Sequence, residues 1–222
     1  MKHSTKYLLV GIFTVLAGIF GQAGGHTVVT ANAATVVEVQ GFGASYGEWS
    51  ARWWEWALSI PAAQNPILDQ TGANCEQGQV GNVWFLAGTF GGSASRTCTI
   101  PAGKPLFFPL INNIGFSPKG NETVIDLRKL AADLINSVDA LTCTLDGAPC
   151  ADNLFAFRAQ SPTFEVIVRT GSLVAPQFYD PMVADGYWLL FAPLDSGTHV
   201  LTFGATTSGG FSTSVTYNLE VL

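Results

Sequence analysis

The chain has 222 residues, of which 48% are apolar and only 12% are charged, so disordered and collagen-like proteins are excluded. Ten Lys and Arg residues stand against sixteen Asp and Glu residues, which gives a formal net charge of −6. Because nucleic acids and anionic membranes repel a chain with this balance, we expect neither as a partner.

The first 33 residues are typical of a removable export signal. Lys2 and Lys6 precede an apolar run at Leu8–Phe20, and Ala31-Asn32-Ala33 supplies the small-x-small pattern that cleavage requires. The apolar run is shorter than the roughly 18 residues that span a bilayer. We therefore expect a mature domain over 34–222 with no membrane span, secreted into an extracellular or periplasmic location. It keeps eight basic residues against sixteen acidic ones.

Four cysteines lie in the predicted mature chain, as expected of an oxidising compartment: Cys75, Cys98, Cys143 and Cys150. An Asp146-Gly147 turn would set Cys143 opposite Cys150, and Pro149 would then fall at a position that needs no N–H. The other two cysteines pair by elimination. Zinc ligation would favour a CxxC motif, which is missing, so we expect two disulfides and no metal site.

The first predicted elements are a short strand at Val36–Val39 and a helix near 45–60. Ser45 and Glu48 have the spacing of a capping box, and Pro61 marks the end of the helix. One apolar stripe runs along this helix through Tyr46, Trp49, Trp53, Trp56 and Ile60.

The rest of the chain is predicted to be rich in strands. We expect strands at 83–86, 97–100, 106–111, 164–168, 187–191, 199–203 and 214–221. A second helix near 124–138 has Leu127, Leu130, Leu134 and Val138 on one face. The sequence thus predicts a single, mainly β domain over 34–222. Its expected architecture is an antiparallel β-sandwich, jelly-roll or Ig-like, with one or two short packed α-helices.

Three motifs in the chain resemble those of a group of secreted microbial proteins. They are WxxxWWxW from Trp49 to Trp56, VWFLAG at 83–88 and RxCxIPxGKxLFFP at 96–109. Two later segments, at 185–188 and 193–199, are similar to the same group. The resemblance implies one exported domain that covers most of the mature chain. Because the group has no established activity, it implies no catalytic residue.

Most cofactor chemistry is excluded by the residues of the mature chain. His199 is its only histidine, so one chain cannot build a metal site from several imidazoles. Neither the P-loop nor the GxGxxG dinucleotide motif occurs. We expect no cofactor.

The best match to a catalytic motif is the GxSxG at Gly43–Gly47, between a predicted strand and a helix. Ser45, a later aspartate and His199 follow the chain order of an α/β-hydrolase triad. The candidate aspartates are Asp180, Asp185 and Asp195. Only a short segment precedes the motif, however, and the rest of the chain has an antiparallel pattern. We favour Ser45 as a helix cap and His199 as a hydrogen-bonded residue on the apolar face of a strand.

The tryptophans offer a second kind of site, because their faces stack on sugar rings. Trp49, Trp53 and Trp56 share the stripe that must face the core, whereas Trp54 lies about 100° away from Trp53 on a helix. Trp54 is therefore the tentative ligand-binding residue.

Two carboxylates also lie on this helix, at Glu48 and Glu55, with Arg52 between them. Such a pair would suit a glycosidase, but a solvated row of charges is the commoner reason for the spacing.

These observations favour an exported, non-enzymatic binding or surface-interaction protein, with a glycan or another extracellular polymer as partner. One alternative is a small serine hydrolase that uses Ser45 and His199. Another is a structural or self-assembling extracellular component. The sequence indicates no oligomeric state.

Overall fold

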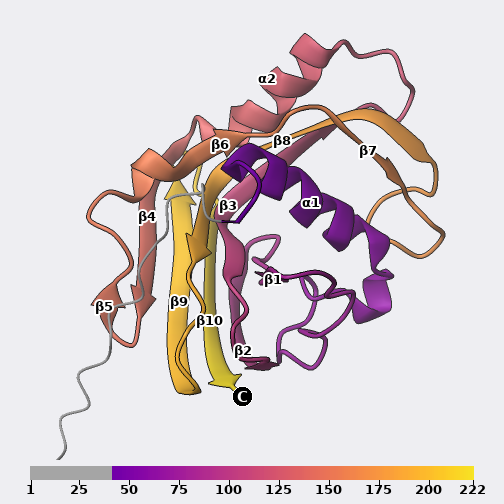
Figure 1. The fold of residues 1–222 in the computed structure, drawn as a ribbon. Helices are drawn as coiled ribbons and strands as arrows, with labels where there is room; N and C mark the ends of the chain where they lie inside the picture. Colours follow the sequence, from indigo (N-terminus) through magenta and orange to yellow (C-terminus); the bar gives the residue numbers. More distant parts are fainter. Residues whose placement is uncertain (1–41) are drawn as a thin grey trace, which may run out of the picture. The chain divides into compact units, whose positions relative to one another are not determined.

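The computed structural model describes residues 42–222. Their regular structure is mainly two β-sheets and two α-helices (Figure 1). The predicted mainly β class is confirmed. The predicted export signal and the predicted strand Val36–Val39 lie outside the described residues.

The first sheet has five strands in the order β1-β3-β8-β6, and β7 also pairs with β8. Their bounds are β1 Trp84–Phe85, β3 Leu106–Phe116, β6 Arg158–Gln160, β7 Phe164–Ile167 and β8 Phe178–Phe191. β3 and β8 are antiparallel, with Leu106 opposite Phe191, whereas β1 and β3 are parallel.

The second sheet has the order β2-β10-β9-β4-β5. Its strands are β2 Gly92–Ile100, β4 Val138–Leu145, β5 Ala148–Pro149, β9 Gly197–Thr207 and β10 Ser212–Val221. β10 pairs with β9 in antiparallel fashion but with β2 in parallel. The purely antiparallel arrangement predicted from the sequence is thus corrected by two parallel pairs. Hydrophobic alternation is the same in both kinds of pairing, so it does not reveal the direction of a partner strand.

The two sheets pack face to face, as predicted for a sandwich. Phe108 of β3 contacts Phe203 of β9, with ring centroids 4.7 Å apart, and Phe203 stacks on Tyr217 of β10. All three rings are buried in one core that draws on both sheets. The predicted alternation of the last strand is confirmed, since its buried side is formed by Val215, Tyr217, Leu219 and Val221.

Helix α1, Tyr46–Ser59, covers the other face of the first sheet (Figure 1). The Ser45–Glu48 capping box is present, and the helix ends before Pro61, as predicted. Trp53 of α1 packs against Trp188 of β8, with ring centroids 5.6 Å apart. The short 3₁₀ helices are Ala62–Gln64 and Leu154–Phe157.

Helix α2, Val124–Ile135, is shorter than the predicted 124–138. Its buried face includes Leu127, as predicted, but continues through Ala131 and Ile135. Leu130, expected on the buried stripe, is 47% exposed, whereas Ala131 is fully buried. The backbone of β3 comes very close to the helix, because a Cβ on Gly115 would lie 2.1 Å from the carbonyl oxygen of Leu127. Such an approach favours a small alanine at the contact. Val138, predicted at the end of the helix, begins β4.

Both predicted disulfides are confirmed, between Cys75 and Cys98 and between Cys143 and Cys150. They indicate folding in an oxidising, extracellular-type environment. Within residues 42–222, neither helix has the length and apolar character that crossing a membrane would need.

Candidate functional site

Ser45, the serine of the GxSxG motif, acts as the cap of α1. Its hydroxyl donates to Glu48 Oε2 at 2.8 Å and accepts from the Glu48 N–H at 3.2 Å. The same carboxylate oxygen accepts from the Ser45 N–H at 2.7 Å. The predicted capping role of Ser45 is therefore confirmed, and within residues 42–222 its hydroxyl has no histidine partner.

His199 has both ring nitrogens engaged elsewhere. Nδ1 lies 2.7 Å from Asp146 Oδ2, and Nε2 lies 3.0 Å from the main-chain carbonyl oxygen of Asp195. Partial burial lowers the pKa of His199. The hydrogen bonds and charges of Asp146 and Asp195 outweigh this effect, so the pKa is raised above 6.5. The structure thus does not join Ser45, His199 and the Asp195 carboxylate into a triad. His199 is hydrogen-bonded as predicted, but to an aspartate of the β4–β5 turn rather than within an apolar face.

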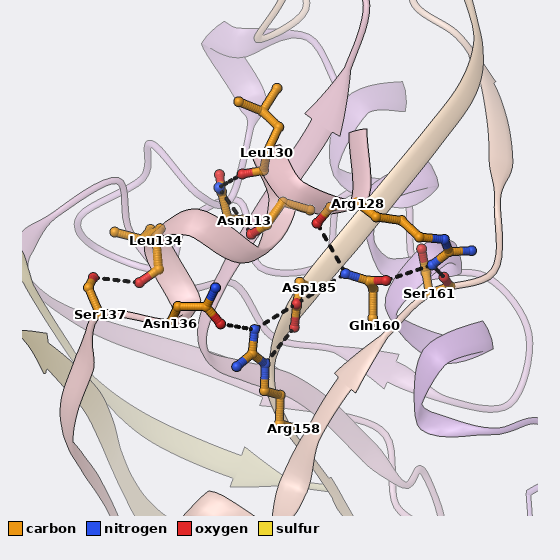
Figure 2. A network of polar contacts seen from close by, with 11 residues as sticks. Asn113, Arg128, Leu130, Leu134, Asn136, Ser137, Arg158, Gln160, Ser161 and Asp185 are labelled. Carbon is orange, nitrogen blue, oxygen red and sulfur yellow. Dashed lines mark hydrogen bonds and ion pairs between the residues drawn. The ribbon is translucent and has the colours of Figure 1, made fainter. Parts of the chain in front are cut away.

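Asp185, another candidate aspartate, is locked in a polar network between α2, β6 and β8 (Figure 2). Its carboxylate accepts from Arg158 Nη2 at 2.9 Å and Nε at 3.1 Å, and from Gln160 Nε2 at 3.2 Å. Arg158 also donates to Asn136, just after α2. The hydrogen bond to Asp185 raises the pKa of Arg158. Because Asp185 is 2% exposed and fully hydrogen-bonded, we assign this network to holding α2 on the sheet.

The network continues along α2 through Arg128 (Figure 2). Arg128 Nη1 donates to the Gln160 side chain at 2.7 Å and to the Ser161 carbonyl at 3.1 Å, and Gln160 donates back to the Arg128 carbonyl. The two residues therefore bridge the helix and β6 in both directions.

Trp54, the tentative ligand-binding tryptophan, is only 5% exposed. Its ring lies edge-on against Trp53, with centroids 5.2 Å apart. The expectation that Trp54 offers an exposed platform is therefore wrong. Residues 168–177, between β7 and β8, hold α1 at its far end, where Ser172 Oγ donates to the Leu58 carbonyl at 2.6 Å. α1 is thus covered on more than the one stripe that its periodicity indicates.

A cleft of about 960 Å³ lies on α1 instead, between the helix and residues 78–85. Its aromatic walls come from Phe42, Trp49, Trp56 and Phe85. Arg52 and Glu55 of α1 supply its charged groups. A cleft that combines aromatic walls with a few polar groups is the usual form of a small-ligand site.

The wall opposite α1 is held in place by several hydrogen bonds. Trp56 Nε1 donates to the Gln77 carbonyl at 2.8 Å. The Gln79 side chain donates to the Phe85 carbonyl at 2.8 Å and accepts from its N–H at 3.0 Å. Lys104 Nζ donates to the Gly81 carbonyl at 2.5 Å. Together with the nearby Cys75–Cys98 disulfide, these hydrogen bonds fix the conformation of the segment that forms this wall.

The two charged side chains of the cleft have different environments. The guanidinium of Arg52 lies over the Trp49 ring, 4.5 Å from its centroid. Glu55 makes no hydrogen bond or ion pair within residues 42–222. Desolvation raises the pKa of Glu55 above 4.5; Arg52 lowers it, and Glu165 raises it further. The cleft therefore holds a carboxylate with unused acceptor capacity.

This arrangement suits the recognition of a ring-shaped polar ligand. The rings of Trp49, Trp56 and Phe85 are buried, at 8%, 6% and 7% exposed, whereas the side chains of Arg52 and Glu55 are exposed and can donate and accept hydrogen bonds, respectively. Within the described part of the chain, no group of three or more His, Cys, Asp or Glu residues has the arrangement of a metal site.

The helix singled out in the sequence forms one side of the cleft, but Trp54 is not among the residues that line it. Glu48 belongs to the helix cap, so the carboxylate pair considered with Glu55 does not form. The usable signal was the i, i+3 and i+7 spacing of Trp49, Arg52 and Trp56, which places them along one side of α1.

No protein-family model, curated protein or solved structure matches this chain. The resemblance to secreted microbial proteins stays a prediction, and the function is inferred from the cleft itself.

Proposed function

We propose that the protein is an exported, non-enzymatic binding protein whose cleft on α1 takes a ring unit of an extracellular glycan. The observation that carries this proposal is a cleft in which the exposed side chains of Arg52 and Glu55 lie beside the aromatic residues Phe42, Trp49, Trp56 and Phe85, the last three of them largely buried. The two disulfides and the predicted export signal support a role outside the cytoplasm.

The chemistry of the cleft supports a sugar better than a purely apolar ligand. A hydroxyl both donates and accepts, so neighbouring hydroxyls match an arginine beside a glutamate. Hydrogen bonds to charged groups contribute about 1.5–3 kcal/mol each, whereas an apolar ligand would leave Glu55 desolvated and unpaired.

Two observations favour binding over the alternatives of hydrolysis and self-assembly. Ser45 and His199 each have other partners, as described above. The edge strand β2 is shielded at Thr97, whose N–H donates to the Thr71 carbonyl at 2.9 Å, and the Cys75–Cys98 disulfide fixes the covering segment there. A covered edge is a common protection against strand-to-strand association.

The proposal is tested by titrating the oxidised, exported protein with soluble β-1,4-linked oligosaccharides and following tryptophan emission and heat. We expect saturable binding with a change in emission, because Trp49 and Trp56 line the cleft. Arg52→Ala and Glu55→Gln should each weaken binding about tenfold or more, since each removes a charged partner.

Lys129→Ala is the matched control, because it removes an exposed charge from α2 instead of α1. It should leave binding unchanged. Absence of binding to every glycan tested, or equal binding by all variants, would refute the proposed function.

A further inference from the structure

The outward face of the second sheet carries hydroxyl side chains in rows that cross four strands. In the first row, Thr144 of β4 lies opposite Thr202 of β9. Thr202 lies opposite Thr216 of β10, and Thr216 lies opposite Ser95 of β2. Their neighbours in sequence, such as Tyr217, are buried in the core between the sheets, so the row points away from that core. We call this side of β2, β4, β9 and β10 the hydroxyl face.

A second row repeats the pattern two residues further along the strands. Its members are Thr142, Gly204, Ser214 and Ser93. The three hydroxyl residues are exposed and line a hollow of about 390 Å³ on this face. Their hydroxyls therefore border a space in which water can be held between them.

The hydroxyl face is nearly free of charge. On its four strands, only two charged side chains reach it: Glu220 at one end, and Asp139 at the other, where it accepts a hydrogen bond from Thr206 Oγ1. Exposed positions are commonly held by Lys, Arg, Asp and Glu, interspersed over the surface. A face of this extent with so few of them indicates a ligand that charge would disturb.

The sheet fixes the spacing of the hydroxyls. Neighbouring strands lie about 4.8 Å apart, and alternate residues of one strand lie about 6.8 Å apart. β10 pairs with both β2 and β9 without a register shift, so this spacing repeats along all three strands. Threonine is restricted at χ1, and the hydroxyls of Thr202 and Thr216 lie 3.1 Å apart in a hydrogen bond. The hydroxyls thus form an ordered, two-dimensional array.

We propose that the hydroxyl face binds ice. The surface of an ice crystal is a periodic array of water molecules, each of which donates and accepts hydrogen bonds. A hydroxyl also does both, so an ordered array of hydroxyls matches such a lattice at many points, directly or through bridging water. A charged side chain would instead orient water around itself and interrupt the match. This function is independent of the cleft on α1, which covers the other face of the first sheet.

Two other occupants suit the hydroxyl face less well. Sugar rings of a polysaccharide surface stack on aromatic side chains, and the outward positions of these four strands hold none. A second copy of the chain would need apolar surface to bury, whereas Val200 is the only large apolar side chain at these positions.

The test measures the gap between the melting and freezing temperatures of a single ice crystal in a solution of the oxidised protein. A second measurement is the enrichment of the protein in a slowly growing ball of ice. We expect a gap that widens with protein concentration, and enrichment in the ice. Thr216→Tyr and Ser95→Tyr each place a bulky ring in the first row, and tyrosine is well suited to strands. Each variant should lose both effects.

Thr163→Tyr is the matched control, because it makes the same change at an exposed position before β7 in the first sheet. It should retain both effects. Circular dichroism checks that the variants fold, and Ser95→Tyr, at an exposed position of the outermost strand, keeps the test decisive if Thr216→Tyr does not.

Three outcomes would overturn the inference. One is a wild-type protein with neither a temperature gap nor enrichment in ice. Another is equal behaviour of the row variants and Thr163→Tyr. The third is sedimentation with insoluble cellulose that the row variants abolish while ice is ignored, since the face would then belong to a polysaccharide. None of these measurements involves the cleft, so the proposed glycan binding is tested separately.

Discussion

The guanidinium of Arg96 donates a hydrogen bond of 2.8 Å to the hydroxyl of Tyr217, and both side chains are 1% exposed. No carboxylate pairs with this buried cation in the part of the chain that the structure describes. Its other donors are satisfied by the main-chain carbonyls of Ile67, Asp69, Ala87 and Gly88. Arg96 therefore ties two loop segments to strands β2 and β10.

Tyr217→Phe is predicted to lower the free energy of unfolding by about 2–3 kcal/mol. The hydroxyl accepts from Arg96 and from the Ala87 N–H, and it donates to the Ala87 carbonyl. Its loss leaves the Ala87 N–H and one Arg96 N–H unpaired, whereas the Ala87 carbonyl still accepts from Arg96. Urea unfolding followed by circular dichroism measures the effect. Tyr179→Phe is the matched control, because its hydroxyl makes a single hydrogen bond, to the Ala175 carbonyl; it should cost about 1 kcal/mol. Equal losses in the two variants would contradict the role given to Tyr217.

The two disulfides should differ in stability and in their effect on the cleft. Cys75–Cys98 has a sequence separation of 23 and Cys143–Cys150 one of 7. Chain entropy then gives about 3.5 kcal/mol for the first and about 2.5 kcal/mol for the second. Replacing the first pair with serines should also weaken glycan binding, because that bond anchors the segment that forms one wall of the cleft. The second pair serves as the control, and weaker binding in its absence would contradict this assignment.

The fold could be predicted from local patterns because each pattern reports directly on one element. The Ser45–Glu48 spacing located the start of α1, and strict alternation at 214–221 gave the buried side of β10. The parallel pairing of β10 with β2 was missed, because alternation looks the same in either direction. The face of α2 was misjudged because leucine was preferred over alanine, and the close approach at Gly115 depends on tertiary structure.

The candidate site was harder to predict, because its walls come from segments distant in sequence. Periodicity placed Trp54 off the buried stripe, but no local signal showed that residues 168–177 return along α1. The partners of Arg96 were also unpredictable. Most of them are main-chain carbonyl groups, whose positions depend on how the loops fold.

Ser45→Ala should destabilise the protein by about 1 kcal/mol without removing any hydrolytic reactivity. The hydroxyl satisfies the Glu48 N–H at the first turn of α1, and loss of such a cap typically has this effect. Thermal unfolding measures the change, and Ser45→Thr, which keeps a hydroxyl that can both accept and donate, should recover most of it. Labelling by a fluorophosphonate that is present in the wild type and lost in Ser45→Ala would instead support a serine hydrolase.

The contact between His199 and Asp146 should make stability depend on pH near neutrality. The pKa of His199 is raised above 6.5 in the folded state, so the protonated form is favoured by folding. The stabilisation is therefore fully present below about pH 6.5 and is lost as pH rises through the folded-state pKa. His199 is the only histidine in the described residues, and Asp146 and Asp195 are the charged groups that act on it.

Asp146→Asn is the sharpest test of this dependence. Asp146 has a φ of 51° at the β4–β5 turn, which asparagine also adopts, and Oδ1 accepts from the Val200 N–H at 2.7 Å, which an amide oxygen can replace. The variant should therefore keep the turn and lose only the charge. Melting temperatures measured across the neutral range should fall with rising pH in the wild type and stay nearly level in Asp146→Asn. Parallel curves for the two proteins would show that the pair does not couple folding to protonation.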